Sequence, residues 1–222
     1  KNDGKINSAG NIVHISGLSW CGGYNQNPKQ YIKQQEVQHL SGACLMIRRS
    51  VLKRAGGMPE GYFMYYEDAA LSSQLNLMGL KLGIVPKAHV VHEYDYAKST
   101  MKWFYIERNR YLYVITVWPL LVIALLLPYL ILVEAGLWAV STIEGRFLSK
   151  IKASASFVKM VPEAIKIRRT VQKRKTITTY KFLLSLSPVL NTLQLGSKSK
   201  FSAVNAVSKF YYRICVLWAQ SV

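Results

Sequence analysis

The sequence predicts an α/β domain followed by membrane-associated helices, and three features indicate this. Residues 1–115 alternate short extended segments with brief helical ones. Residues 116–142 form a hydrophobic segment that is either transmembrane or re-entrant. Residues 143–222 form a basic tail in which apolar and basic side chains alternate, as in amphipathic helices.

Charge is distributed unevenly along the 222 residues, which carry a formal net charge of +18. Residues 1–110 contain 14 basic and 8 acidic side chains, whereas residues 111–222 contain 15 basic and 3 acidic ones. A strongly basic half that also contains a long apolar stretch indicates anionic membrane lipids as a partner. Nothing resembles a zinc finger, an RNA-recognition motif or a basic recognition helix, so we expect no nucleic acid partner.

The three cysteines, Cys21, Cys44 and Cys215, are far apart and form no C-x-x-C pair. Their odd number excludes a complete disulfide framework and favours reduced thiols in a cytosolic compartment. The chain begins at Lys1, with no initiator Met and no visible signal peptide. We interpret it as a fragment without its N-terminal part.

The stretch from Gly42 to His92 organises the first half of the chain. Ser50 is expected to cap a brief helix that Gly56-Gly57 closes. An aromatic run then leads to two adjacent carboxylates, and a helix with its apolar residues on one face follows. The aromatic residues are Tyr62, Phe63, Tyr65 and Tyr66, the carboxylates are Glu67 and Asp68, the helix is Ala69 to Met78 with Gly79 as its stop, and extended segments are expected at Lys81–Val85 and His89–His92.

Glu67 and Asp68 lie where a loop becomes a helix, and two interpretations follow. Free backbone N–H groups and the helix dipole favour an ionised carboxylate there, which beside an aromatic-lined cleft is suited to general-base chemistry. Alternatively Asp68 only caps the helix and Glu67 is solvated. Position alone favours the cap.

The run "SGACLMIRRSVLKRAGGMPEGYFMYYEDAALSSQLNLMGLKLGIVPKAHVVHEY" resembles the C-terminal half of a family 2 glycosyltransferase domain, and is most similar to rhamnosyltransferase-like members. The resemblance covers roughly residues 1–115. It implies a GT-A-type nucleotide-diphospho-sugar transferase domain, of which the chain has the C-terminal half. The alternative function is a non-catalytic basic membrane-binding module.

The resemblance implies an inverting enzyme that moves a sugar from a nucleotide-sugar donor to a lipid-linked or glycan acceptor in cell-surface polysaccharide synthesis. Asp68, beside Glu67, would be the base, and His92 a ligand of a divalent metal, Mn²⁺ or Mg²⁺. Ala70 and Gln74 depart from the family pattern, which often has an acidic residue and an Arg there. Without the donor-binding half, we expect no turnover by this fragment.

Four further residues are expected on the acceptor or substrate side: Trp20, Gly42, Ala43 and Arg48. An aromatic ring such as Trp20 stacks on sugar C–H groups, small residues let a ligand approach the backbone, and a guanidinium matches phosphate oxygens. The alternatives are an ordinary packed aromatic for Trp20 and a solvated edge for Arg48.

His89 and His92 are three apart on an expected strand, so they face opposite ways and do not chelate one metal together. A metal role for His92 therefore depends on the resemblance. Glu93-Tyr94-Asp95 has the spelling of an acidic metal motif but follows the expected base, and we interpret it as coincidence. The Glu107–Tyr111 segment resembles single-sugar transferases, because the Gln-x-x-Arg-Trp signature of processive synthases is absent.

The hydrophobic segment is interrupted by Pro119, Pro128 and Glu134, and basic residues lie on both sides of it. A single span and a re-entrant hairpin bent near Pro128 both remain open, and a buried soluble helix pair is the third alternative. Residues 150–181 are expected on a membrane surface, and residues 201–222 as a final interfacial helix. The expected location is the membrane, with the catalytic part on its cytoplasmic face.

Overall fold

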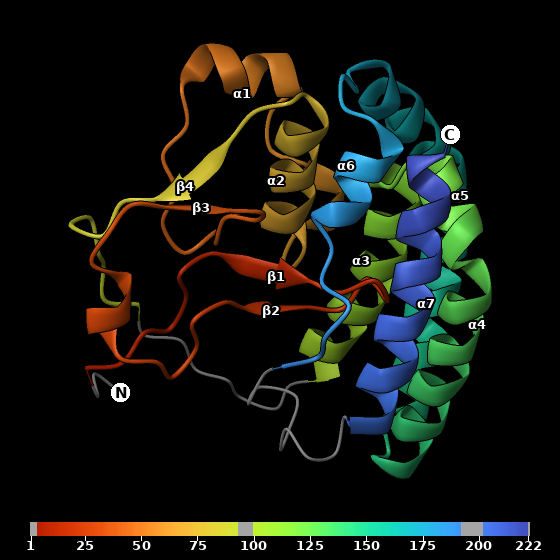
Figure 1. Ribbon diagram of the computed structural model, residues 1–222. Coiled ribbons are helices and arrows are strands. Elements are labelled where there is room, and N and C mark those ends of the chain that lie inside the picture. Colours follow the sequence, from red (N-terminus) through yellow and green to blue (C-terminus); the bar gives the residue numbers. More distant parts are fainter. Residues whose placement is uncertain (1–3, 93–99, 192–201, 222) are drawn as a thin grey trace.

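The computed structural model describes residues 4–92, 100–191 and 202–221. Short strands and two short helices lie on one side of the molecule, and long helices lie on the other (Figure 1). The strands are β1 (Asn11–Val13), β2 (Ser19–Cys21), β3 (Gln35–Val37) and β4 (Leu82–Ile84). The helices are α1 (Arg49–Ala55), α2 (Glu67–Leu77), α3 (Thr100–Val117), α4 (Leu120–Ile143), α5 (Phe147–Lys173), α6 (Thr179–Leu184) and α7 (Ser202–Gln220), with 3₁₀ turns η1 (Pro28–Tyr31) and η2 (Glu60–Tyr62).

The described strands form two antiparallel sheets of two strands each, β1 with β2 and β3 with β4. Ile12 lies opposite Trp20 in the first sheet. The two sheets meet where Asn11 donates its backbone N–H to the carbonyl of His39 at 2.7 Å. The predicted mixed α/β class is confirmed, whereas the described residues do not display a GT-A-type sheet.

The local elements around the carboxylates follow the sequence closely, with three corrections. Helix α1 is capped by Arg48 without a side-chain hydrogen bond, not by Ser50, and Gly56 ends it at φ +95° as expected. Residues 17–30, whose Gly, Asn and Pro residues predict a loop, contain β2, and all three of its residues pair with β1. Residues 86–92 form no strand, because Pro86 ends the extended chain after β4. The Glu93-Tyr94-Asp95 motif lies outside the described residues, as does Ser99, which the sequence predicts to cap the helix that follows.

Helix α3 is the centre of the packing and contacts both α5 and α2. Its Leu112, Tyr113 and Val117 are completely buried, together with Trp118 just after it. Arg168 of α5 donates to the carbonyls of Ile115 and Trp118, both at 2.7 Å. These bonds satisfy carbonyls that a helix end leaves free, so α5 both covers and terminates α3.

Helix α4 is continuous through Pro128, so the hairpin considered there does not form. Helix α7 packs along it: the Tyr129 and Ser208 hydroxyls are 2.6 Å apart, and Tyr211 stacks on Tyr129 with ring centroids 5.9 Å apart. The helix is long and apolar enough to cross a membrane by length and composition, and only 17% of its most apolar stretch is buried. A buried soluble core helix does not fit that exposure.

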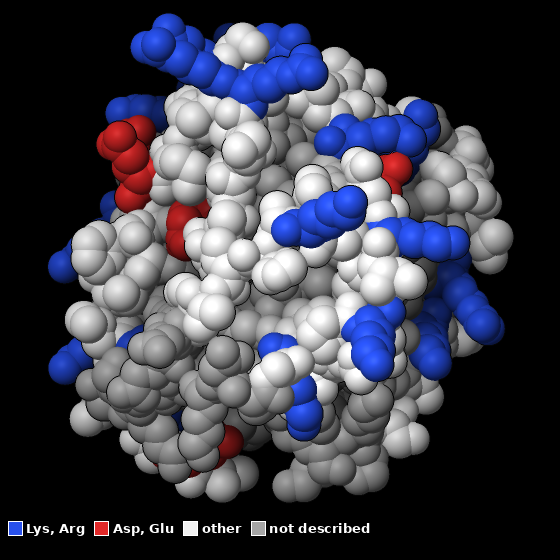
Figure 2. All heavy atoms as spheres, turned by 90° about the vertical axis from the view of Figure 1, so that its left-hand side faces the viewer, with Lys and Arg blue, Asp and Glu red and all other residues white. Residues whose placement is uncertain are grey.

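Basic side chains predominate among the charged groups on the face seen in Figure 2, with a cluster at the top where α1 lies. The predicted tail helices are present as α5 and α7, and both expose apolar side chains. On α7 these are Val204, Val207, Phe210, Ile214, Leu217 and Trp218.

Candidate functional site

Asp68 lies in the first turn of α2, and its carboxylate is held by three donors. Oδ2 accepts from the Asn11 side-chain amide at 2.7 Å and from the Gly42 backbone N–H at 2.8 Å. Oδ1 accepts from the Ala69 N–H at 2.7 Å, which is one of the free donors of the helix start. The capping interpretation therefore accounts for one oxygen, while the other joins β1 and the 41–47 segment to the helix.

Burial raises the pKa of Asp68 above its ordinary value, against the opposing effect of the N–H donors of Gly42, Ala69 and Asn11. A carboxylate with a raised pKa takes up a proton more readily than an exposed one does. Three donors fix its orientation, so the group is both positioned and made more basic. Such a group is equipped to accept a proton from a bound hydroxyl.

Glu67 lies beside it, half-buried, and its Oε2 is a buried oxygen for which the described residues supply no hydrogen-bond donor. Burial raises the pKa of Glu67, and the neighbouring Asp68 charge adds to that effect. Gly42 packs against both carboxylates. A Cβ at this position would lie 3.4 Å from the Asp68 Cβ and 3.5 Å from Glu67 Oε1, so glycine leaves the approach to the pair uncovered.

The aromatic run before the carboxylates has an unusual backbone. Phe63, Tyr65 and Tyr66 all have positive φ, at 63°, 62° and 71°. Side chains with a Cβ rarely adopt this conformation, so the segment persists only because its surroundings hold it. Tyr66 is the residue before α2, and its hydroxyl donates to the Gly17 carbonyl at 2.8 Å.

Asn109 and Arg108 of α3 provide that support. The Asn109 side-chain amide lies within hydrogen-bonding distance of three carbonyls, those of Tyr62, Met64 and Tyr65, at 2.7–2.8 Å. Arg108 donates to the Tyr62 carbonyl at 2.9 Å and to the Asn109 side chain at 2.9 Å. Helix α3 therefore fixes the loop that leads into Glu67.

The residues expected on the acceptor side fall in different places. Gly42 and Ala43 are exposed, and Gly42 donates its backbone N–H to Asp68, so their acceptor-side role stays a prediction. Arg48 is exposed at the start of α1, which agrees with the solvated alternative. Trp20 is only 6% exposed and packs beside His14, so its ring offers no open face for a sugar. Here the packed-aromatic alternative describes the position.

His92, the expected metal ligand, is exposed after β4. Among the described residues, no group of three or more His, Cys, Asp or Glu side chains gathers as a metal site. The Asp68 carboxylate is moreover occupied by N–H donors. The described residues alone do not fit a divalent metal, and a role for His92 would need ligands beyond them.

Sequence reasoning missed Asn11 and the pair Arg108–Asn109 as parts of the site. Asn11 directly follows Gly10 in the run Ser8-Ala9-Gly10-Asn11. A polar residue at that place, next to a turn-forming glycine, was the only signal in the sequence that could have indicated Asn11. A pocket of about 410 Å³ also lies beside Asn11, lined among others by Tyr31 and His39. Its lining comes from segments far apart in sequence, so no local pattern announces it.

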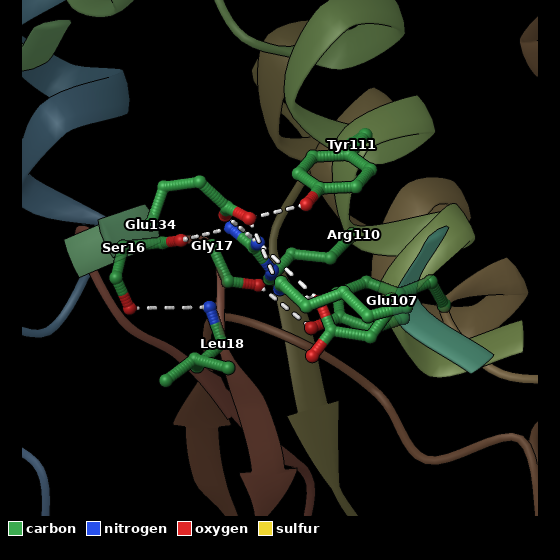
Figure 3. A network of polar contacts seen from close by, with 9 residues as sticks. Ser16, Gly17, Leu18, Glu107, Arg110, Tyr111 and Glu134 are labelled. Atoms are coloured by element: carbon green, nitrogen blue, oxygen red, sulfur yellow. Dashed lines mark hydrogen bonds and ion pairs between the residues drawn. The ribbon is translucent and has the colours of Figure 1, made fainter. Parts of the chain in front are cut away.

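A buried ion network joins α3, α4 and α5 (Figure 3). Lys150 contacts Glu107 at 2.8 Å and Glu134 at 3.0 Å, and Arg110 pairs with both carboxylates. Arg110 also donates to the Ser16 carbonyl at 3.3 Å, and Tyr111 donates to Glu134. Glu134, which interrupts the apolar segment in the sequence, thus points into the protein and is neutralised there.

Comparison with known proteins finds partial relatives. The chain is 40% identical over 73 residues to an N-acetylglucosaminyl-diphospho-decaprenol L-rhamnosyltransferase of Mycobacterium tuberculosis, which is 33% of this chain and 24% of that protein. It is 34% identical over 85 residues to rhamnosyltransferase WbbL of Escherichia coli K12, which is 38% of this chain and 31% of that protein. No family model and no solved structure matches the chain.

The curated relatives are therefore rhamnosyltransferases, matched over about a third of this chain. The chain spans between a quarter and a third of their length. This supports a glycosyltransferase relationship and leaves donor and acceptor open.

Proposed function

We propose that this chain belongs to an inverting glycosyltransferase that moves a sugar from a nucleotide-sugar donor to a lipid-linked or glycan acceptor in cell-surface polysaccharide synthesis. The observation that carries the proposal is the Asp68 carboxylate, which burial makes more basic and which three donors orient beside the uncovered Gly42. The partial similarity to rhamnosyltransferases supports the reaction class.

In the proposed reaction, Asp68 takes the proton of the acceptor hydroxyl as its oxygen bonds to the anomeric carbon. The bond between that carbon and the leaving phosphate oxygen breaks on the opposite face, and the nucleoside diphosphate departs with the electron pair. One displacement of this kind inverts the anomeric configuration and needs no enzyme nucleophile. Glu67, next to the proposed base, contributes a second carboxylate whose Oε2 is buried without a hydrogen-bond donor from the described residues.

A divalent cation is the expected cofactor by resemblance, with His92 as one ligand. The described residues do not assemble that site, so no step is assigned to it. We propose a membrane location with the catalytic residues on the cytoplasmic face. Exposed apolar residues on α4 and α7 and the basic second half support the membrane part of this proposal.

The test replaces Asp68 by Asn in the longest natural polypeptide that contains this chain. The amide keeps the size and most hydrogen bonds but cannot take up the proton, so kcat should fall by roughly a hundredfold or more with donor affinity almost unchanged. Glu60→Gln, an exposed carboxylate-to-amide change on the same loop, is the matched control and should leave kcat unaltered. Product analysis by NMR should find an inverted anomeric centre, and a retained one would exclude Asp68 as the base.

The second candidate is a non-catalytic basic membrane-binding module. The exposed apolar side chains of α4 and α7 favour it, because lipid binding alone would explain why they are exposed. A module of this kind has no use for an oriented, half-buried carboxylate pair. Equal activity of the wild type and Asp68→Asn, with unchanged recovery on vesicles, would favour this candidate over the enzyme.

A further inference from the structure

Phe63 presents a large aromatic ring to solvent from a strained backbone. It is 72% exposed. It is the middle residue of a three-residue turn, with φ 63° and ψ −61°, closed by the bond from the Met64 N–H to the Tyr62 carbonyl at 2.8 Å. A γ-turn of this hand is rare and costly for a residue with a side chain. Helix α3 maintains this turn through Asn109 and Arg108, which both bind the Tyr62 carbonyl, so the backbone that carries the ring is held in place.

Tyr105 extends this ring into a pair. The ring centroids of Phe63 and Tyr105 are 5.4 Å apart and the planes are tilted by 38°. The Arg108 guanidinium lies 4.7 Å from the Tyr105 centroid and also contacts the Phe104 ring at 5.7 Å. Arg108 thus packs on the aromatic cluster while it bonds the Tyr62 carbonyl, which ties the pair to the loop.

The same loop carries Phe63 and the carboxylates. Phe63 and Asp68 are five residues apart, so their Cα atoms lie within about 18 Å by chain length alone. Tyr66, between them, is fixed to Gly17, so the segment has little freedom to swing. If the hydroxyl of an acceptor reaches Asp68, the neighbouring part of that acceptor lies within range of the Phe63 and Tyr105 rings.

We infer that Phe63 and Tyr105 form a carbohydrate-stacking subsite for the acceptor. The chemistry is the contact of sugar C–H groups with an aromatic face, for which an exposed, rigid, uncharged ring is suited. This inference deepens the proposed function and rests on it for the identity of the ligand. It gives Phe63 the role that the sequence led us to expect of Trp20, whose ring is buried.

The test measures binding of soluble methyl glycosides (N-acetylglucosaminide, glucoside and rhamnoside) by saturation-transfer NMR, without any donor. The wild type and Asp68→Asn should both transfer saturation to ring protons of at least one glycoside. Phe63→Ala should weaken that binding by about two- to tenfold, the range expected of one aromatic contact, and Phe63→Trp should restore it. Phe210→Ala is the matched control, because Phe210 is similarly exposed (68%) but lies on α7.

Equal transfer to the wild type and Phe63→Ala, including none to either, would overturn the inference. Loss of vesicle flotation in Phe63→Ala with unchanged glycoside signals would overturn it too and assign the ring to the bilayer. The proposed catalytic role fails separately: a fully active Asp68→Asn whose glycoside binding still depends on Phe63 would remove the base and leave the subsite.

Discussion

Asp68 is held by residues that are distant in sequence, Asn11 at 57 positions and Gly42 at 26. These two donors stabilise the ionised carboxylate, while burial favours its protonated form. The balance between them sets the proton affinity of the group. A change in either donor therefore changes the pH range in which the carboxylate is ionised and could act as the proposed base.

The pH dependence of kcat/KM should show an acid limb from Asp68. As the proposed base, Asp68 would work only when ionised, so activity should fall as pH falls through its pKa, which burial raises above the ordinary value of about 4. Asn11→Ala removes one donor to the ionised form and should raise the pKa further, moving the limb to higher pH by roughly 1 unit.

The control is Asn76→Ala, which removes an exposed amide bonded to the Gln38 carbonyl, near the other end of α2. Its pH profile should match that of the wild type. An acid limb that stays in place in Asn11→Ala would mean that another group titrates there.

The sequence located the carboxylates correctly because a helix start is a local signal. An aromatic run, two acidic residues and a periodic apolar helix suffice to place Glu67 and Asp68 in a first turn. It did not reveal Asn11 or Asn109, because each acts on a segment more than 40 residues away. Trp20 was ambiguous for the same reason: whether a loop aromatic is packed depends on what covers it.

At the scale of elements, α4 has one charged side chain, and this side chain binds it to α3 and α5. Glu134 is the only charged residue between 120 and 143. It meets Arg110 and Lys150, which share Glu107 as their other carboxylate. Two cations and two anions balance in this cluster, so removing one charge leaves an excess that is buried.

Glu134→Leu should destabilise the protein by about 3–5 kcal/mol, because Arg110 and Lys150 would then share one carboxylate inside the protein. Replacing Lys150 by Met as well restores the balance, with Arg110 still paired to Glu107, and should recover most of the loss. Urea unfolding in a mild detergent, followed by far-UV circular dichroism, measures both variants. Equal stability of the single and double variants would show that charge balance is not what matters here.

The helix-forming pattern predicted α5 and α7 well, because apolar periodicity and basic faces are properties of one segment. It did not decide between a hairpin and a continuous helix at Pro128. Proline lacks only one N–H and is tolerated within apolar helices whose neighbours compensate. Packing of α7 against Tyr129, next to Pro128, is such a neighbour, and no local pattern contains it.

Over the whole molecule, apolar exposure is concentrated on the long helices, while the strands and short helices form the other side (Figure 1). The exposed residues of α4 include Leu127, Ile131, Leu132, Val140 and Ile143. A face of this extent together with a basic second half is suited to an anionic lipid surface.

Ile131→Glu should reduce recovery of the protein with anionic vesicles in a flotation assay by severalfold, because a carboxylate placed in the apolar face must leave the lipid. Ile131 is 62% exposed on α4. Ile32→Glu, at a residue 72% exposed in the α/β part, is the matched control and should float as the wild type does. Similar losses in both variants would indicate an effect of net charge rather than of the α4 face.

The global arrangement was only partly predictable. Composition and periodicity predict an α/β part followed by a helical part, and all the described strands lie before residue 85. They do not show that α3 belongs to both parts, because it packs on α2 as well as on α5. That double role depends on side chains such as Tyr113, whose partner Ser73 is 40 residues away.

If the proposed function and membrane location hold, the ion network affects how the carboxylates are placed relative to the lipid. Glu134 of α4 binds Arg110, Arg110 binds the Ser16 carbonyl, and the adjacent Gly17 carbonyl receives the hydroxyl of Tyr66, the residue before Glu67. These contacts connect the apolar helix to the residue that precedes the carboxylates. If lipid fixes the tilt of α4, it also fixes the height of Asp68 above the headgroups. The enzyme would then select acceptor lipids by the length of the group between the membrane surface and the reacting hydroxyl. Only a group of matching length would bring that hydroxyl to Asp68.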